Sequence, residues 1–228
     1  MKYQWLFFDA DETLFYFDDF AGLKKLFLTY DIPFTREDYA QYKLINKPLW
    51  VQYQEKRISA EALKTERFQQ WAQKLNVSAN ELNSGFLQAM AQICKPLPGA
   101  ELLLESLSNK VDMAIITNGF TEVQQARLEN TGLKKYFKEV VISEQVGLAK
   151  PDVEIFEHTL DKVKHKDKNS VLMVGDNPHS DILGGMQAGI DTCWLNHHAA
   201  EVPDKIKPTY QVADLHQLKQ LLLNGFRV

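Results

Sequence analysis

Residues 5–15, WLFFDADETLF, place three carboxylates (Asp9, Asp11 and Glu12) directly after a short aromatic and aliphatic run. An apolar run of this length that is followed at once by an acidic turn is typical of a buried β-strand rather than a helix. Negative charge at the end of a buried strand is costly unless another group compensates for it. The stretch therefore predicts either a strand that runs out into a solvated turn or a strand end that meets a cation from elsewhere in the chain.

The composition is that of an ordinary globular protein. The chain has 228 residues, 45% of them hydrophobic and 25% charged, and a formal net charge of −4. This length suits one large domain or a domain with a smaller insertion, and the negative balance argues against nucleic acid or an anionic membrane as a partner. Cys94 and Cys193 lack metal-ligand spacing and fit a reduced interior. Since no segment reads as a signal peptide or a membrane span, we expect a cytoplasmic protein.

From Asp18 to about Ile93 the pattern is helical throughout. Apolar residues recur at helical spacing in four segments, and polar capping residues stand where these segments begin. The predicted helix starts lie at Asp18, Thr35, Ser59 and Ser78. Because this stretch contains no convincing strand, it predicts a small helical bundle.

After the turn signal KPLPGA (residues 95–100) the pattern alternates between strand and helix. Such alternation predicts a mainly parallel sheet covered by helices, and the strand at 3–8 joins the same sheet. We therefore expect an α/β fold with a Rossmann-like, doubly wound parallel sheet, formed by residues 1–16 and 96–228. We expect residues 17–95 to form a helical bundle that is inserted after the first strand. The other predicted strands are residues 111–116, 139–143, 171–175 and 192–195.

Polar and charged residues stand where the predicted strands end. In open parallel sheets, ligands bind beyond the carboxyl ends of the strands, at the point where the strand order reverses. The residues at or just after these ends are Asp9, Asp11, Thr117, Asn118, Lys150, Asp176 and Asp181. We expect them to converge on one place.

Two acidic strand ends in one cleft repel each other unless a cation lies between them, and an all-oxygen site with few protein ligands suits hydrated Mg²⁺. The metal, Lys150, a hydroxyl and backbone N–H groups together form a receptor for a phosphoryl group. An aspartate could then act as the nucleophile, and a second carboxyl two residues later could move the protons.

The ordered set DADET, TNG, AKP and GDNPHSD resembles the four motifs of the haloacid dehalogenase-like hydrolase superfamily, and the helical insertion resembles the cap domain of that family. Four motifs in order are far more specific than any one of them. The segments FFDADETLF, NKPLW, ITNGF, AKP, MVGD and SDILGG further resemble pyrimidine 5'-nucleotidases of this superfamily, which remove phosphate from nucleoside monophosphates such as dUMP and dTMP. The resemblance implies a Mg²⁺-dependent phosphomonoester hydrolase with an aspartyl-phosphate intermediate.

The same resemblance implies the roles of the acidic residues. Asp9 would be the nucleophile and a Mg²⁺ ligand. Asp11 would be the general acid and base and would give its backbone carbonyl to the metal, and Asp176 would be a further metal ligand. Asp181 would hold a metal-bound water or orient Lys150.

Phosphate binding is implied for three other positions. Thr117 would bind the phosphoryl oxygens through its hydroxyl, and Asn118 would do so through its backbone N–H. Lys150 would neutralise both the phosphate and Asp9. The expected partner is thus a small-molecule phosphate ester, a nucleoside monophosphate, with no nucleic acid and no membrane, and the chain would be a monomer or a dimer.

Two local features leave questions open. The commoner family motif has Gly where this chain has Glu12, so the turn either adopts an ordinary conformation or tolerates strain. We assign Glu12 no catalytic role. Of the six histidines, we expect only His179 to lie near the site. Most aromatic residues of the cap are expected in its core, with Trp50 and Tyr53, beside Asn46, the candidates to face a nucleobase.

Other functions share these motifs. A haloacid dehalogenase uses the same nucleophile, but that branch typically lacks the second aspartate, so Asp11 favours ester hydrolysis. A sugar-phosphate phosphatase or phosphomutase would share every motif. A non-enzymatic phosphoacceptor module would show no turnover of any phosphomonoester.

Overall fold

The computed structural model describes residues 1–225, and the contacts among them divide the chain into two compact units. The first contains Met1–Tyr16, Lys95–Gly119 and the described residues from Thr131 onward. The second contains Phe17–Cys94 together with Phe120–Asn130, a segment that the sequence-based division assigns to the α/β part. The predicted domain boundaries at residues 16/17 and 95/96 stay a prediction. The last residues of the predicted α/β part, 226–228, lie outside the described ones.

The first unit is built on a six-stranded, all-parallel sheet with the order β3-β2-β1-β4-β5-β6. This confirms the predicted α/β class with a parallel sheet. The strands are β1 (Trp5–Phe8), β2 (Asp112–Thr117), β3 (Glu139–Ile142), β4 (Val171–Gly175), β5 (Asp191–Leu195) and β6 (Tyr210–Val212). The sequence did not indicate β6, because its three residues, YQV, contain too short an apolar run.

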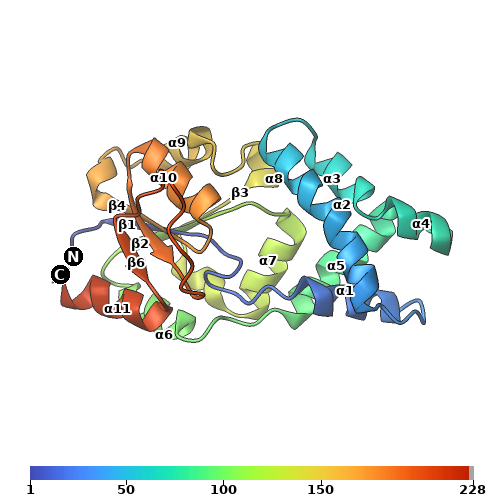
Figure 1. Ribbon diagram of the computed structural model, residues 1–228. Helices are drawn as coiled ribbons and strands as arrows, with labels where there is room; N and C mark the ends of the chain where they lie inside the picture. The colour runs from blue at the N-terminus through green and yellow to red at the C-terminus, as the bar shows by residue number, and fades with distance from the viewer. Residues whose placement is uncertain (226–228) are drawn as a thin grey trace. The chain divides into compact units, whose positions relative to one another are not determined.

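Every residue of β1 and β4 is buried. A near-continuous apolar strand is typical of a parallel sheet that is covered on both faces. Trp5 and Phe7 of β1 pack in one core cluster with Phe156 of α9 and Ala188 of α10. Figure 1 shows α9 and α10 on one side of the sheet and α6 and α11 on the other. The helices of this unit are α6 (Ala100–Leu107), α8 (Ser143–Val146), α9 (Val153–Lys162), α10 (Leu183–Ala188) and α11 (Leu215–Asn224), with short turns η1 (Leu133–Tyr136), η2 (Lys168–Ser170) and η3 (Pro178–Ile182).

The register of the central strands decides which side chains meet. Phe8 of β1 lies opposite Ile115 of β2 and Val174 of β4. Since parallel strands end at the same edge, the residues that follow β1, β2 and β4 all lie at the carboxyl edge of the sheet. The strand order reverses between β1 and β4, and this is where open α/β sheets bind their ligands.

The second unit contains helices only. All four predicted helix starts carry side-chain caps. Asp18 accepts from the Ala21 N–H, Thr35 and Asp38 form a reciprocal capping box, and the hydroxyls of Ser59 and Ser78 accept from backbone N–H groups. The third predicted helix is two helices, because Arg67 and Phe68 interrupt it and both side chains are buried. The helices are α1 (Asp19–Leu28), α2 (Arg36–Gln54), α3 (Ala60–Glu66), α4 (Gln69–Leu75), α5 (Ala79–Ile93) and α7 (Thr121–Asn130).

Aromatic rings fill the interior of this helical unit. Phe27 and Phe34 stack with their ring centroids 4.8 Å apart, and Tyr42 packs against Phe68 at 5.7 Å. All four side chains are buried, as the sequence pattern predicts for the majority of these aromatic residues. Across residues 1–225, no helix combines the length and the apolar character that a membrane span requires.

Candidate active site

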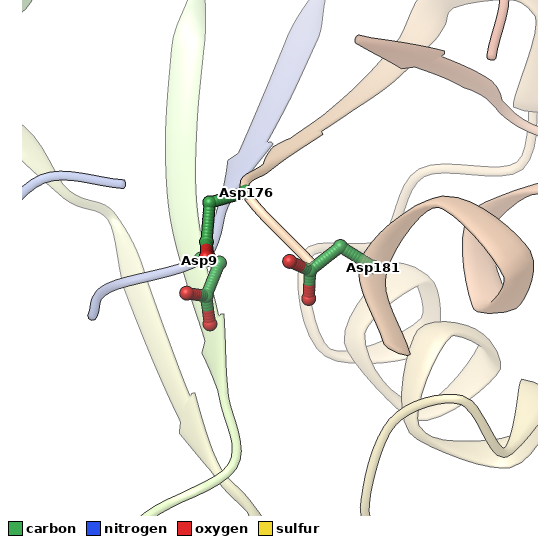
Figure 2. Close-up of side chains that lie close together, drawn as sticks. All are labelled: Asp9, Asp176 and Asp181. Atoms are coloured by element: carbon green, nitrogen blue, oxygen red, sulfur yellow. The ribbon is translucent and has the colours of Figure 1, made fainter. Parts of the chain in front are cut away.

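Three carboxylates meet at the carboxyl edge of the sheet. Asp9 follows β1, Asp176 follows β4, and Asp181 lies in the helical turn η3. One carboxylate oxygen from each lies within 4.8 Å of the others. Figure 2 shows Asp181 pointing from its turn toward the other two side chains. The structure therefore brings together carboxylates that are up to 172 positions apart in sequence.

The electrostatics of this cluster are unfavourable without a cation. Burial raises the pKa of Asp9 to about 7; Lys150 opposes this rise, and the negative charges of Asp181 and Asp11 add to it. Burial, with the charges of Asp9 and Asp181, raises the pKa of Asp176 to about 8. A divalent ion would offset this repulsion, and an all-carboxylate donor set suits Mg²⁺. The residues present thus fit a hard metal ion.

Lys150 supplies a positive charge from the chain itself to this cluster of carboxylates. Its side chain is 1% exposed, and its Nζ donates to Asp9 Oδ1 at 2.5 Å and to the carbonyl oxygen of Ile116 at 2.6 Å. It also pairs with Asp181 Oδ1 at 2.8 Å. Burial opposes the charged form, but Asp181 and Asp9 outweigh that cost and raise the pKa of Lys150. The three ammonium protons therefore have three oxygen partners, and the side chain is fixed.

Asp181 is held by its own neighbours. Its Oδ2 accepts from the backbone N–H of Asn177 at 3.0 Å, and its Oδ1 accepts from the hydroxyl of Ser180 at 3.1 Å. Gly175 makes room for it, because a Cβ atom at that position would collide with the Asp181 side chain. A glycine directly before Asp176 was the signal that could have indicated this close approach.

The loop after β2 and the segment that carries Lys150 are joined by one amide side chain. Asn118 Nδ2 donates to the carbonyl oxygen of Lys150, and the Lys150 N–H donates to Asn118 Oδ1, both at 2.8 Å. Thr117, the last residue of β2, is 1% exposed. The N–H of Gly119, two residues later, donates to Ser143 Oγ at 3.1 Å. The side chain of Asn118 thus positions Lys150, and phosphate binding by Thr117 and by the Asn118 N–H stays a prediction.

Sequence reasoning missed two residues that hold Asp176. The hydroxyl of Thr13 accepts from the Asp176 N–H at 3.1 Å and lies 3.3 Å from Asp176 Oδ1, to which it donates. Trp194 Nε1 donates to the Asp176 carbonyl oxygen at 2.8 Å. Thr13 belongs to the acidic turn and could have been noted there. Trp194 becomes visible only from the register of β4 and β5, where it lies opposite Gly175.

The turn that contains Asp9 and Asp11 answers the question left open at Glu12. Glu12 has φ 54°, a left-handed conformation that residues other than glycine seldom adopt. Its N–H donates to the carbonyl oxygen of Phe15 at 2.8 Å, and the Phe15 N–H donates to the carbonyl oxygen of Ala10 at 3.0 Å. The chain therefore uses the strained form of this turn rather than an ordinary one.

One expectation about the histidines is wrong. His197, not His179 alone, lies near the site, because its Nε2 is 2.9 Å from the carbonyl oxygen of Glu12. His179 is exposed, and its backbone N–H caps the turn through Asn177 Oδ1. His197 comes after β5, so its proximity to the first strand depends on the path of the loop.

In the helical unit, the residues considered for a nucleobase lie on α2. Asn46, Trp50 and Tyr53 are spaced i, i+4 and i+7, which places them on one face of the helix. The Trp50 ring lies 5.3 Å from the ring of Phe120 and 5.8 Å from that of Tyr53. Within residues 1–225, no donor reaches the buried Oδ1 of Asn46. An amide oxygen and an indole ring thus stand on the same helix face.

Comparisons with known proteins agree with this geometry. The haloacid dehalogenase-like hydrolase family matches residues 3–189. The chain is 53% identical over 222 residues to the pyrimidine 5'-nucleotidase YjjG of Escherichia coli (strain K12), covering 97% of this chain and 99% of that protein. It is 35% identical over 230 residues to the pyrimidine 5'-nucleotidase PynA of Streptococcus pneumoniae (strain ATCC BAA-255 / R6), covering 97% and 96%. The crystal structure of YfnB from Bacillus subtilis bound to magnesium is similar, with a TM-score of 0.85, 30% identity, and coverage of 98% of this chain and 100% of that one.

Proposed function

Because the chain belongs to the haloacid dehalogenase-like hydrolases, we propose that it hydrolyses nucleoside 5'-monophosphates with pyrimidine bases through an aspartyl-phosphate intermediate. The observation that carries the chemistry is the position of Asp9 at the end of β1, where it pairs with the Lys150 ammonium and lies beside the carboxylates of Asp176 and Asp181. The pyrimidine nucleotide is proposed from the two 5'-nucleotidases that are similar along almost their whole length.

In the first step, Asp9 attacks the phosphorus atom and the bond between phosphorus and the 5'-oxygen breaks. Lys150 donates to Asp9 Oδ1, so we assign the attack to Oδ2. Lys150 favours the ionised carboxylate against the effect of burial, and it also neutralises charge on the transferring group. The Asp11 carboxyl gives its proton to the departing 5'-oxygen, and the nucleoside leaves as an alcohol.

In the second step, Asp11 removes a proton from water, and the water oxygen attacks the phosphorus of the acyl phosphate. The bond between phosphorus and Asp9 breaks, which frees inorganic phosphate and the Asp9 carboxylate. Thr117 and the Asn118 N–H would bind the phosphoryl oxygens in both steps.

Asp9 and Asp176, with the backbone carbonyl of Asp11, would hold Mg²⁺, and Asp181 would orient Lys150 or hold a metal-bound water. When bound, the ion supplies positive charge that offsets the carboxylates and the phosphoryl oxygens. The carboxylates that repel one another at this edge support the proposal. We further propose a cytoplasmic location and a small, freely diffusing substrate.

A phosphate-release screen over nucleoside monophosphates and sugar phosphates, with Mg²⁺ and with excess EDTA, tests this function. We expect dUMP and dTMP to be the best substrates and EDTA to abolish turnover. Full activity in EDTA would contradict the metal role, and sugar 1-phosphates converted to isomers without phosphate release would show a mutase instead. The nucleotide preference is tested further by Trp50→Ala and Asn46→Ala, which should raise KM for dUMP more than for p-nitrophenyl phosphate.

The role of Asp11 is tested with p-nitrophenyl phosphate, because its leaving group needs no proton. In Asp11→Asn the first step should proceed and the second should stall. We expect a burst of about one nitrophenolate per enzyme molecule, followed by very slow turnover, and phosphate attached to Asp9. Steady turnover without a burst would argue against this assignment.

A further inference from the structure

The turn between Asp11 and Phe15 needs support from outside itself. A non-glycine residue with positive φ persists where the surrounding structure fixes it. Glu12 uses both backbone polar atoms for this purpose, since its N–H donates to the Phe15 carbonyl and its own carbonyl oxygen lies 2.9 Å from His197 Nε2. A carbonyl oxygen only accepts, so His197 is the donor in this contact. The second anchor thus comes from a residue 185 positions away.

His197 is itself held in place by the loop that carries it. Asn196 Nδ2 donates to the carbonyl oxygen of Ala200, and the Ala200 N–H donates to Asn196 Oδ1, both at 2.9 Å. Asn196 is 5% exposed, and its N–H donates to the carbonyl oxygen of Val212 in β6 at 2.8 Å. The loop after β5 is therefore closed on itself and joined to the sheet, although the His197 ring is exposed.

The other ring nitrogen contacts the start of α11. His197 Nδ1 lies 3.1 Å from the carbonyl oxygen of Ala213, and the Ala213 N–H donates to Gln217 Oε1 at 2.9 Å. The N–H of Gln217 donates in turn to Asp214, the N-cap of α11. A neutral imidazole has one N–H and serves one of the two carbonyls, and a protonated ring serves both. Through this ring the acidic turn is linked to a helix cap and to the edge of the sheet.

We infer that His197 is a positioning residue for the hydrolysis, which fixes the Glu12 carbonyl and thereby the placement of Asp11 relative to Asp9. This inference rests on the proposed function, because it concerns the same turn. Because Glu12 follows Asp11 directly, a rotation of the peptide group after Glu12 changes the position of the Asp11 carboxyl, the proton donor, relative to the Asp9 carboxylate, the nucleophile. A displacement of about 1 Å in such a pair lowers the rate strongly.

A double-mutant cycle tests the inference. His197→Ala and His197→Gln are made in the wild-type chain and in a Glu12→Gly background, where glycine adopts positive φ without strain. His198→Ala, at the exposed neighbouring position, is the matched control. We measure kcat and KM for dUMP, the thermal unfolding midpoint, and hydrogen exchange at the Glu12 amide.

We expect His197→Ala to lower kcat about tenfold with little change in KM, the fold-change that corresponds to the loss of one ordinary hydrogen bond. His197→Gln should recover most of the rate, since its amide N–H reaches a similar acceptor. In the Glu12→Gly background the further effect of His197→Ala should shrink to about twofold or less. The Glu12 amide should exchange at least about fivefold faster in His197→Ala, and His198→Ala should match the wild type in every measurement.

Equal kcat in His197→Ala and the wild type would overturn the inference, as would the same loss in both backgrounds or a loss explained entirely by a lower unfolding midpoint. The exchange rate of the Glu12 amide tests the anchor even if no phosphoester is hydrolysed, and an unchanged rate would overturn the inference. Absence of turnover in the wild type would instead reject the proposed function, so the two failures are distinguishable.

Discussion

The pKa values of aspartates are shifted in opposite directions at the two edges of the parallel sheet. At the amino edge, Asp191 Oδ2 accepts from Lys2 Nζ at 2.6 Å and from the Tyr3 hydroxyl at 2.5 Å. Burial alone would raise the pKa of Asp191, but these hydrogen bonds outweigh it and hold the pKa below its usual value. At the carboxyl edge, the pKa values of Asp9 and Asp176 are raised to about 7 and about 8.

The difference lies in the ratio of donors to carboxylates. Asp191 is one carboxylate with several donors, so its charge is compensated within the protein. The other edge gathers three carboxylates around a single buried ammonium, that of Lys150. Perturbed pKa values of this kind cluster at functional sites. At the amino edge the donors compensate the carboxylate, whereas at the carboxyl edge the charged forms of the carboxylates are disfavoured unless a cation offsets them.

Of the changes that would test this comparison, we expect the largest effect at Asp9, the proposed nucleophile. Asp9→Asn should lower kcat by about 10⁴-fold or more, because the amide cannot form the acyl phosphate. Its unfolding free energy should stay equal or rise, since one of the mutually repelling carboxylates is gone. Asp191→Asn is the matched change at the other edge and should keep wild-type kcat. Phosphate release and urea unfolding of both variants check this, and a similar kcat for the two would contradict the assignment.

Lys150→Met should destabilise the fold as well as abolish activity. Removing one partner of a buried ion pair leaves uncompensated charge, here on Asp9 and Asp181, and costs about 3 kcal/mol of unfolding free energy or more. Lys168, which pairs with Glu157 at the surface, provides the control. Lys168→Met should change the unfolding free energy by about 0.5 kcal/mol or less. Equal losses of unfolding free energy for Lys150→Met and Lys168→Met in urea titrations would show that the buried ammonium contributes no more than the surface one.

A smaller effect is expected from the residue that supports Asp176. Thr13→Val removes the two contacts between the hydroxyl and Asp176 while keeping the side-chain volume. Loss of such a supporting group typically costs about 10- to 100-fold in activity or metal affinity. Thr13→Ser should restore most of the loss. Titration of activity with Mg²⁺ distinguishes a lower maximal activity from a weaker metal affinity. A titration curve identical to that of the wild type would show that Thr13 does not support the site.

The smallest effect belongs to the amino edge. The folded-state pKa of Asp191 is below its unfolded value of about 3.9, so its stabilising contribution is present above that pH and is lost as the pH falls through the folded value. Asp191→Asn should therefore be less stable than the wild type at pH 6, by less than about 1 kcal/mol, and equally stable near pH 2. Denaturant titrations at both pH values measure this, and a difference that grows toward low pH would contradict the sign.

Much of the fold and the site could be predicted from the sequence because it depends on local patterns. A short apolar run with turn residues after it, such as 171–175, indicates a buried strand, and parallel strands bring their carboxyl ends to one edge. Asp9 and Asp176 could therefore be placed together from the sequence. Trp194 and His197 could not be found in this way. Their contacts depend on the register of β5 and on the loop after it, and neither leaves a pattern in the sequence.

The helical unit shows the same limit. Its caps at Thr35 and Ser78 are local and could be predicted, whereas the break at Arg67 depends on what the buried guanidinium contacts, namely Asn83 on another helix. The φ of Glu12 was likewise undecided, because the sequence shows a residue that disfavours the left-handed region and does not show the anchors that hold it there.

The reciprocal amide pair between Asn118 and Lys150 has a consequence for how the chain tolerates change. Two hydrogen bonds between the Asn118 side chain and the Lys150 backbone join segments 32 positions apart. The spacing of Thr117 and Lys150 therefore does not depend on the length of chain between them. We expect insertions or deletions at exposed positions such as Lys134 and Lys135 to leave that spacing unchanged. Engineered changes in the length of this stretch should therefore leave the lysine in place.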